Sequence, residues 1–209
     1  INIKMAIMQL VKKLVKLGRV AINTLIRRII SFSFSMMNYI SNYKSKLGDI
    51  LLASDGEKLI GLWFLDQKYF ASTLKEDYEI KELPVFQETK RWLDLYFSSQ
   101  IPDFTPPLKL IGTPFQQLVY SLLLEIPYGE TVTYGYLATI ISKIKNVDHF
   151  SAQAVGNAIS HNPISIIIPC HRVIGTNNTL TGYAGGLEKK EYLLNLEKSK
   201  VRRIANEKM

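Results

Sequence analysis

Proline divides this chain more sharply than any other residue type. Three prolines fall within residues 100–107, the last two in succession. Proline fixes φ and lacks a backbone donor, so this stretch disfavours both helix and central strand and is predicted to connect two domains. A chain of 209 residues is long enough for two small domains. We expect an N-terminal domain over residues 37–105, a C-terminal domain over 106–200 and a tail over 201–209.

Residues 1–36 form a basic leader that differs from the rest of the chain. Residues 1–48 hold nine Lys and Arg and no acid, which leaves 17 basic and 18 acidic residues from Asp49 onward. The net charge of +8 therefore does not indicate a broad positive surface on the body of the protein. A basic amphipathic surface helix, a transit peptide and translation from upstream of the true start all remain open. We favour the last, because the chain begins with Ile and Met37 directly precedes a well-patterned domain.

Cysteine and histidine are too scarce for several classes of site. The single cysteine, Cys170, excludes an intrachain disulfide and a cysteine-rich zinc site. With only three histidines in addition, we expect no metal and no cofactor. No uncharged apolar run in the leader approaches the roughly 18 residues of a membrane span. We therefore expect a cytoplasmic protein that does not bind membranes.

The N-terminal domain is predicted to be a small α/β unit. Two apolar runs, residues 49–53 and 58–64, are separated by Asp-Gly, which is the strongest short hairpin signal. Residues 83–99 then place apolar side chains at helical intervals, with Pro84 near the first turn, where its missing N–H costs least. This pattern indicates a helix packed on a small sheet.

The C-terminal domain is predicted to open with three short helices. They begin after Thr113, Thr133 and Ser151, whose side-chain oxygens suit the N-cap position. Short helices with tight turns are compatible with a helix-turn-helix, whose last helix enters a DNA groove. Helical bundles that do not bind DNA are at least as common, so the pattern alone does not decide between them.

The run around Cys170 is the strongest indication of chemistry. Three isoleucines at 166–168, predicted to form a stiff strand, lead into Pro-Cys-His-Arg at 169–172. A thiol acts as a nucleophile only when ionised, and neighbouring cations, a helix N-terminus or a proton-accepting histidine would favour the thiolate. The alternative is a buried structural cysteine.

With these residues in view, the sequence resembles the 6-O-methylguanine-DNA methyltransferase family over residues 37–198. The resemblance implies a ribonuclease H-like α/β domain with a small sheet and a helix, followed by a mostly α, winged-helix-like helix-turn-helix domain. It also implies DNA repair by irreversible transfer of an alkyl group from 6-O-alkylguanine to Cys170, once per molecule, with 4-O-alkylthymine left open as a second substrate. The matching motifs lie at residues 113–117, 126–131, 133–138, 154–156, 162–163, 168–172 and 182–187.

The same resemblance implies roles for individual residues. Cys170 matches the alkyl acceptor, His171 the histidine that takes its proton through a water, and Glu197 the carboxylate that orients that histidine. Tyr134 matches the tyrosine that stacks at the flipped nucleotide and protonates the departing guanine. The substrate-binding positions implied are the carbonyl of Val173 for the exocyclic amine, Tyr183 and Ala184 in the loop that walls the pocket, and Asn162, which braces the turn beneath it.

The implied partner is double-stranded DNA containing alkylated guanine, bound by a monomer without an obligate protein partner. The DNA-binding positions are Gln153, Tyr134, Arg172 and Thr176. Gln153 departs from the family pattern, since many members carry there an arginine that enters the base stack. A glutamine brings no charge, so DNA binding is expected to be weaker or less sensitive to salt. The alternative function is that of an alkyltransferase-like protein that binds lesions without transfer, and Cys170 argues against it.

Overall fold

The computed structural model describes residues 37–207 and six isolated positions before them, namely Gln9, Lys12, Val15, Lys16, Gly18 and Thr24. The chain separates into two compact units, Ile1–Met37 and Asn38–Met209. The hypotheses about the basic leader therefore concern residues that lie almost entirely outside the described part. Among the described residues, no helix is both long and apolar enough to cross a membrane.

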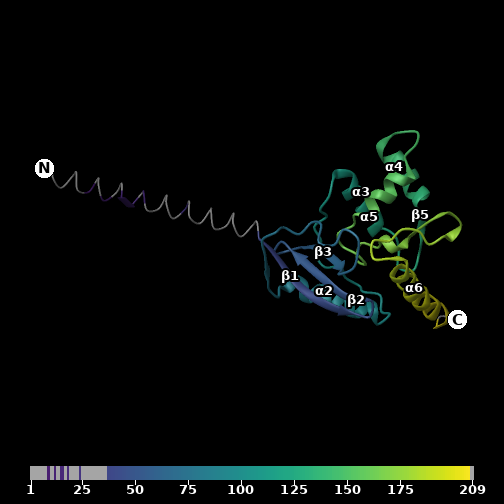
Figure 1. Cartoon of the computed structure of the whole chain (residues 1–209), viewed down its shortest axis with the longest axis horizontal. Helices are drawn as coiled ribbons and strands as arrows, with labels where there is room; N and C mark the ends of the chain where they lie inside the picture. The colour runs from purple at the N-terminus through teal and green to yellow at the C-terminus, as the bar shows by residue number, and fades with distance from the viewer. Residues whose placement is uncertain are drawn as a thin grey trace. The chain divides into compact units, whose positions relative to one another are not determined.

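A four-stranded sheet forms the first part of the larger unit (Figure 1). Its strands are β1 (Asn38–Ser45), β2 (Gly48–Ser54), β3 (Leu59–Phe64) and β4 (Tyr78–Ile80), in the order β3-β2-β1-β4. β2 and β3 are antiparallel, which confirms the predicted hairpin, and β4 runs parallel to β1. β1 was not expected, because polar residues such as Asn38 and Ser41, both buried here, obscure its apolar alternation.

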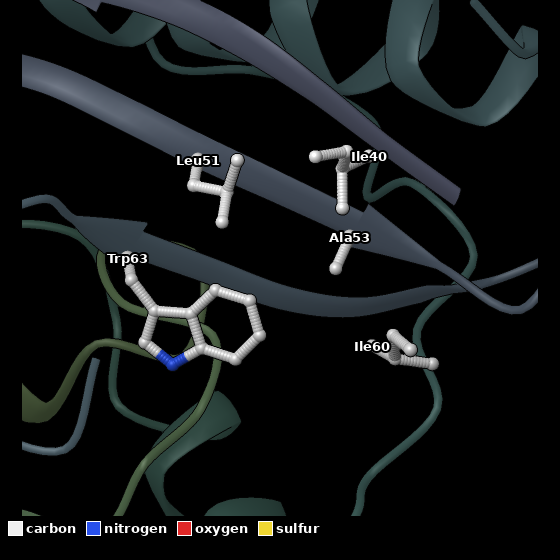
Figure 2. Packing of buried hydrophobic residues seen from close by; sticks show 5 residues of the cluster. All are labelled: Ile40, Leu51, Ala53, Ile60 and Trp63. Carbon is white, nitrogen blue, oxygen red and sulfur yellow. The ribbon is translucent and has the colours of Figure 1, made fainter. Parts of the chain in front are cut away.

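The sheet buries residues on both faces. Ile40, Leu51, Ala53, Ile60 and Trp63 form one cluster (Figure 2). The intervening residues of β2, Ile50 and Leu52, point to the other face and are also fully buried. Helix α2 (Pro84–Phe97) packs against β1 and β2. The predicted arrangement of one helix on a small sheet is confirmed.

Leu59 and Leu62 of β3 pair with other parts of the chain along the outer edge of the strand. Leu59 exchanges backbone hydrogen bonds with the connector, through Pro107 and Lys109. Further along the strand, the N–H of Leu62 donates to the carbonyl of Pro163 (2.9 Å), and the N–H of Ser165 donates back to Leu62 (2.9 Å). The turn that leads to Cys170 is therefore paired to the sheet.

The helices α3 (Pro114–Leu124), α4 (Tyr134–Lys145) and α5 (Ala152–Ser160) begin where the sequence predicts. Thr113, Thr133 and Ser151 each accept a hydrogen bond from the backbone two or three residues into the helix, at 3.1–3.3 Å. Helix α5 packs against both α3 and α4. A helical C-terminal part following a small sheet is the predicted fold class, which is confirmed.

Two local predictions are wrong. Residues 166–168 form a buried turn rather than a strand, with Ile166 at a φ of 69°. The hydrogen bonds of the buried Asn162 side chain to the carbonyls of Ile164 and Ile168 hold that turn, and they overrule the strand preference of isoleucine. Helix α6 (Leu187–Glu207) continues past Lys198, so residues 201–207 are helical and not a tail; no glycine or proline interrupts it.

Candidate active site

Cys170 begins a short 3-10 helix, Cys170–Arg172, that leads into strand β6 (Val173–Ile174). β6 pairs in parallel with β5 (Val132–Thr133), immediately before the start of α4, and so brings Tyr134 to the same place. The cysteine is 4% exposed and lines a cavity of about 190 Å³. Tyr134, Tyr183 and Ala184 line it as well, so the structure brings these predicted residues together.

Asn162 lies directly beneath Cys170. Its Nδ2 donates to the carbonyl of Ile168 (2.9 Å) and to Sγ of Cys170 (3.2 Å), while its Oδ1 accepts from the N–H of Ile164 (3.0 Å). The side chain is 3% exposed. The asparagine therefore holds the turn through the carbonyl of Ile168 and also donates to the sulfur.

The thiol of Cys170 is not pre-ionised. Burial raises its pKa, and the hydrogen bond from Asn162 and the charge of Lys190 offset only part of that rise. The charge of Lys190 favours the thiolate, as expected of a nearby cation, but burial of the thiol outweighs it in the resting site. Deprotonation has to be assisted by a base when the thiol reacts.

His171, the residue that follows Cys170, is paired with Glu197. Both side chains are fully buried, and Nε2 of His171 lies 2.8 Å from Oε1 of Glu197. Burial alone would raise the pKa of Glu197, but His171 and Arg172 outweigh it and hold the pKa at about 2. Burial lowers the pKa of His171 despite the carboxylate, so the ring is neutral.

The tautomer of His171 follows from its partner. An ionised carboxylate can only accept, so Nε2 carries the proton and Nδ1 keeps its lone pair. Nδ1 is buried and has no hydrogen-bond partner among the described residues. The neutral ring is thus oriented as a proton acceptor, with Glu197 ready to stabilise the imidazolium.

Arg172 does not face DNA, contrary to the sequence-based prediction. Its residue is 8% exposed, Nε donates to Oε2 of Glu197 (2.9 Å) and Nη2 to Oε1 (3.0 Å). Nη1 donates to the carbonyl of Ile126 (2.7 Å). Glu197 also accepts from the hydroxyl of Tyr96 (2.7 Å) and the N–H of Gly129 (2.9 Å). Arg172 is committed to this buried network, in which each of its three nitrogens donates a hydrogen bond.

Lys190 is a site residue that the sequence analysis missed. Its fully buried ammonium donates to the carbonyls of Val173 (2.6 Å), Thr181 (2.5 Å) and Gly182 (3.1 Å). Burial lowers its pKa from 10.5 to about 8. A lone lysine on a helix is usually solvated, but Lys190 shares the buried face of α6 with Leu193, Leu194 and Glu197. That spacing was the available signal.

A wide groove adjoins the pocket. It is an open cavity of about 870 Å³, lined by Gln153 near the start of α5, by Tyr134 and by Thr181. Tyr134 borders both the groove and the pocket of Cys170. Thr176 lies in an exposed 3-10 helix, Thr176–Asn178, and lines neither of them.

Two family models match the chain. The 6-O-methylguanine DNA methyltransferase ribonuclease-like domain matches residues 38–110, and the DNA binding domain of the same family matches residues 114–199. The chain belongs to this family.

Members of the methyltransferase family are similar in sequence to this protein over most of its length. The methylated-DNA–protein-cysteine methyltransferases of Haemophilus influenzae and Methanosarcina acetivorans are each 45% identical to it, over 77% of this chain and 86% and 99% of their own lengths. The crystal structure of Mycobacterium tuberculosis OGT in complex with DNA has a TM-score of 0.66 and 39% identity, covering 79% of this chain and 94% of that one.

Proposed function

We propose that this protein repairs DNA by moving an alkyl group from 6-O-alkylguanine to Cys170, one group per molecule. The observation that carries the proposal is a buried free thiol in a pocket, followed directly in the sequence by a neutral histidine whose Nδ1 is unpaired among the described residues and whose Nε2 contacts a carboxylate. The names of the relatives, methylated-DNA–protein-cysteine methyltransferases, describe the same reaction.

The proposed reaction is an in-line displacement. The proton of Cys170 passes to His171, the thiolate attacks the alkyl carbon, and a sulfur–carbon bond forms as the carbon–oxygen bond breaks. The electron pair of the broken bond stays with guanine, which takes a proton from the hydroxyl of Tyr134. No residue of the pocket provides for hydrolysis of the thioether in this scheme, so each protein molecule reacts once.

The guanine base is proposed to occupy the cavity of Cys170 after leaving the duplex. The carbonyl of Val173 would accept from its exocyclic amine, since a carbonyl has two lone pairs and Lys190 uses only one. The loop with Tyr183 and Ala184 would offer an N–H to the 6-oxygen. Thr176 is proposed to contact DNA outside the pocket. A monomer in a reducing cytoplasm suits a protein that depends on one free thiol.

Intact mass spectrometry tests the proposed function. After incubation with a duplex containing 6-O-methylguanine, the wild-type mass should rise by one methyl group, and peptide mapping should locate it on Cys170. Tight binding of the alkylated duplex without any gain in mass would instead favour the lesion-binding alternative.

Gln153 should govern how the protein handles duplex DNA rather than how it reacts. Gln153→Arg should raise DNA affinity and steepen its logarithmic salt dependence by about one phosphate equivalent, because an added cation releases about one more counterion. Gln153→Ala should slow repair of duplex DNA much more than reaction with free 6-O-benzylguanine, since only the duplex requires base extrusion. Rates on the two substrates, measured in parallel, provide the check, and equal losses on both would place Gln153 in the fold instead of the groove.

Lys190→Met should lower the free energy of unfolding by about 1–3 kcal/mol, because it leaves three carbonyls without their donor. Alkyl transfer should slow as well, since two of those carbonyls belong to the pocket loop at Thr181 and Gly182. Urea unfolding and single-turnover rates measure the two effects. Lys198→Met, at an exposed position of the same helix, is the control. Equal losses of stability and of transfer rate in the two variants would contradict a specific role for the buried ammonium of Lys190.

A further inference from the structure

One wall of the pocket of Cys170 comes from the ribonuclease-like domain. Lys68, which follows β3, lines the same cavity as Cys170, and every other lining residue belongs to residues 134–184. We propose that Lys68 limits which alkyl groups reach Cys170, so that the ribonuclease-like domain takes part in selecting the substrate. The inference rests on the function proposed above.

The backbone of Lys68 is bonded to the loop that carries Ala184. Its N–H donates to the carbonyl of Ala184 (2.9 Å), a residue that lines the same cavity. Close by, Asp66 forms an ion pair with Lys189 of α6 (2.6 Å). Two separate contacts thus join this segment to the loop at Ala184 and to helix α6.

Gln67 ties the same segment to the turn before Cys170. It is 5% exposed, and its Oε1 accepts from the N–H of Phe64 (3.0 Å) and from the hydroxyl of Ser165 (3.0 Å). A buried amide whose oxygen is shared in this way leaves little freedom to the residues on either side of it. The position of Lys68 is therefore coupled to the position of the nucleophile.

Tyr69 connects the segment that carries Lys68 to the end of helix α5. Its ring stacks on His161 at the end of α5, with centroids 4.0 Å apart, although its φ of 60° is unfavourable for a tyrosine. Such a conformation persists where the surrounding contacts over-determine it, and it is often found beside ligands. Lys68 itself is exposed, and its ammonium lies 4.9 Å from the centroid of the Tyr69 ring.

A pocket wall that is held in place by several contacts limits the size of the alkyl group that fits. The cavity of about 190 Å³ is smaller than the roughly 300 Å³ at which pockets for drug-sized molecules begin. Additional carbons on the alkyl group must therefore compete with the lining side chains. In this proposal the methylene stem of Lys68 limits the space for the alkyl group, and a substitution can shorten it without removing the backbone hydrogen bond to Ala184.

The test compares transfer rates from duplexes carrying 6-O-methylguanine or 6-O-benzylguanine, as the ratio of benzyl to methyl. Lys68→Ala should raise this ratio about tenfold, the usual effect of a few methylenes in an apolar pocket. Lys68→Trp should lower it. Lys68→Met, which keeps the stem and loses the charge, should leave it within about twofold. Lys58→Ala, an exposed lysine of the same domain, is the control for the substitution itself.

An unchanged ratio in both Lys68→Ala and Lys68→Trp overturns the inference, as does an equal change in the two rates. A shift in Lys68→Met as large as that in Lys68→Ala also overturns it, because charge rather than bulk would then discriminate. Failure of the wild type to transfer even a methyl group would overturn the proposed function, which separates that outcome from the others.

Discussion

Cys170→Ser is expected to bind an alkylated duplex as the wild type does but to gain no alkyl mass. A serine hydroxyl is much less acidic and less polarisable than a thiol, so His171 cannot generate a competent nucleophile from it. The substitution is nearly isosteric, and Asn162 can donate to the new oxygen as it does to sulfur. Intact mass and a gel-shift assay on the same preparations measure transfer and binding separately.

The stoichiometry of the wild type provides the matching control. Because Cys170 is the only cysteine, titration of free thiol should fall from one per chain to none as alkyl mass rises to one group. Alkylation of the serine variant, or of any other residue in the wild type, would refute Cys170 as sole acceptor. Sustained turnover with an unmodified thiol would refute single use.

Glu197→Gln is expected to lower the free energy of unfolding by about 3–5 kcal/mol, the usual cost of removing one partner of a buried ion pair. The carboxylate accepts from Tyr96, Gly129, His171 and Arg172, and the amide cannot neutralise the buried guanidinium. Urea unfolding gives the difference. Glu191→Gln, exposed on the same helix, is the control, and a loss of similar size there would assign the effect to helix charge instead.

The same comparison has a defined pH dependence. Folding lowers the pKa of Glu197 from 4.5 to about 2, so its contribution is complete above about 4.5 and is lost as the pH falls towards 2. The gap in unfolding free energy between wild type and Glu197→Gln should therefore narrow across that window. A gap that stays constant would mean that the carboxylate is not ionised in the folded protein.

Features set by neighbouring residues could be predicted from the sequence. The Asp-Gly hairpin and the capped starts of α3, α4 and α5 depend on contacts within a few residues, and they occur where expected. The turn at 166–168 could not be predicted, because three isoleucines favour a strand until Asn162 and the edge of β3 impose another path.

The site shows the same division. Cys170, Tyr134 and Asn162 gather as expected from their motifs, whereas Tyr96 reaches Glu197 across 101 positions of sequence and no local pattern announces it. The resemblance implied that Arg172 contacts DNA, but a position in a motif does not fix the direction of a side chain, and here the guanidinium turns inward to Glu197.

Strand β3 is the last strand of its sheet, and unpaired strand edges readily recruit other chains and promote aggregation. Here the edge is occupied at Leu59 by the connector and at Leu62 by the turn that carries Cys170 towards the pocket. The reactive segment thus also shields the sheet from self-association. A modification that separated this turn from β3 would expose unpaired backbone groups of the strand. Aggregation would then accompany the loss of the geometry around the sulfur of Cys170.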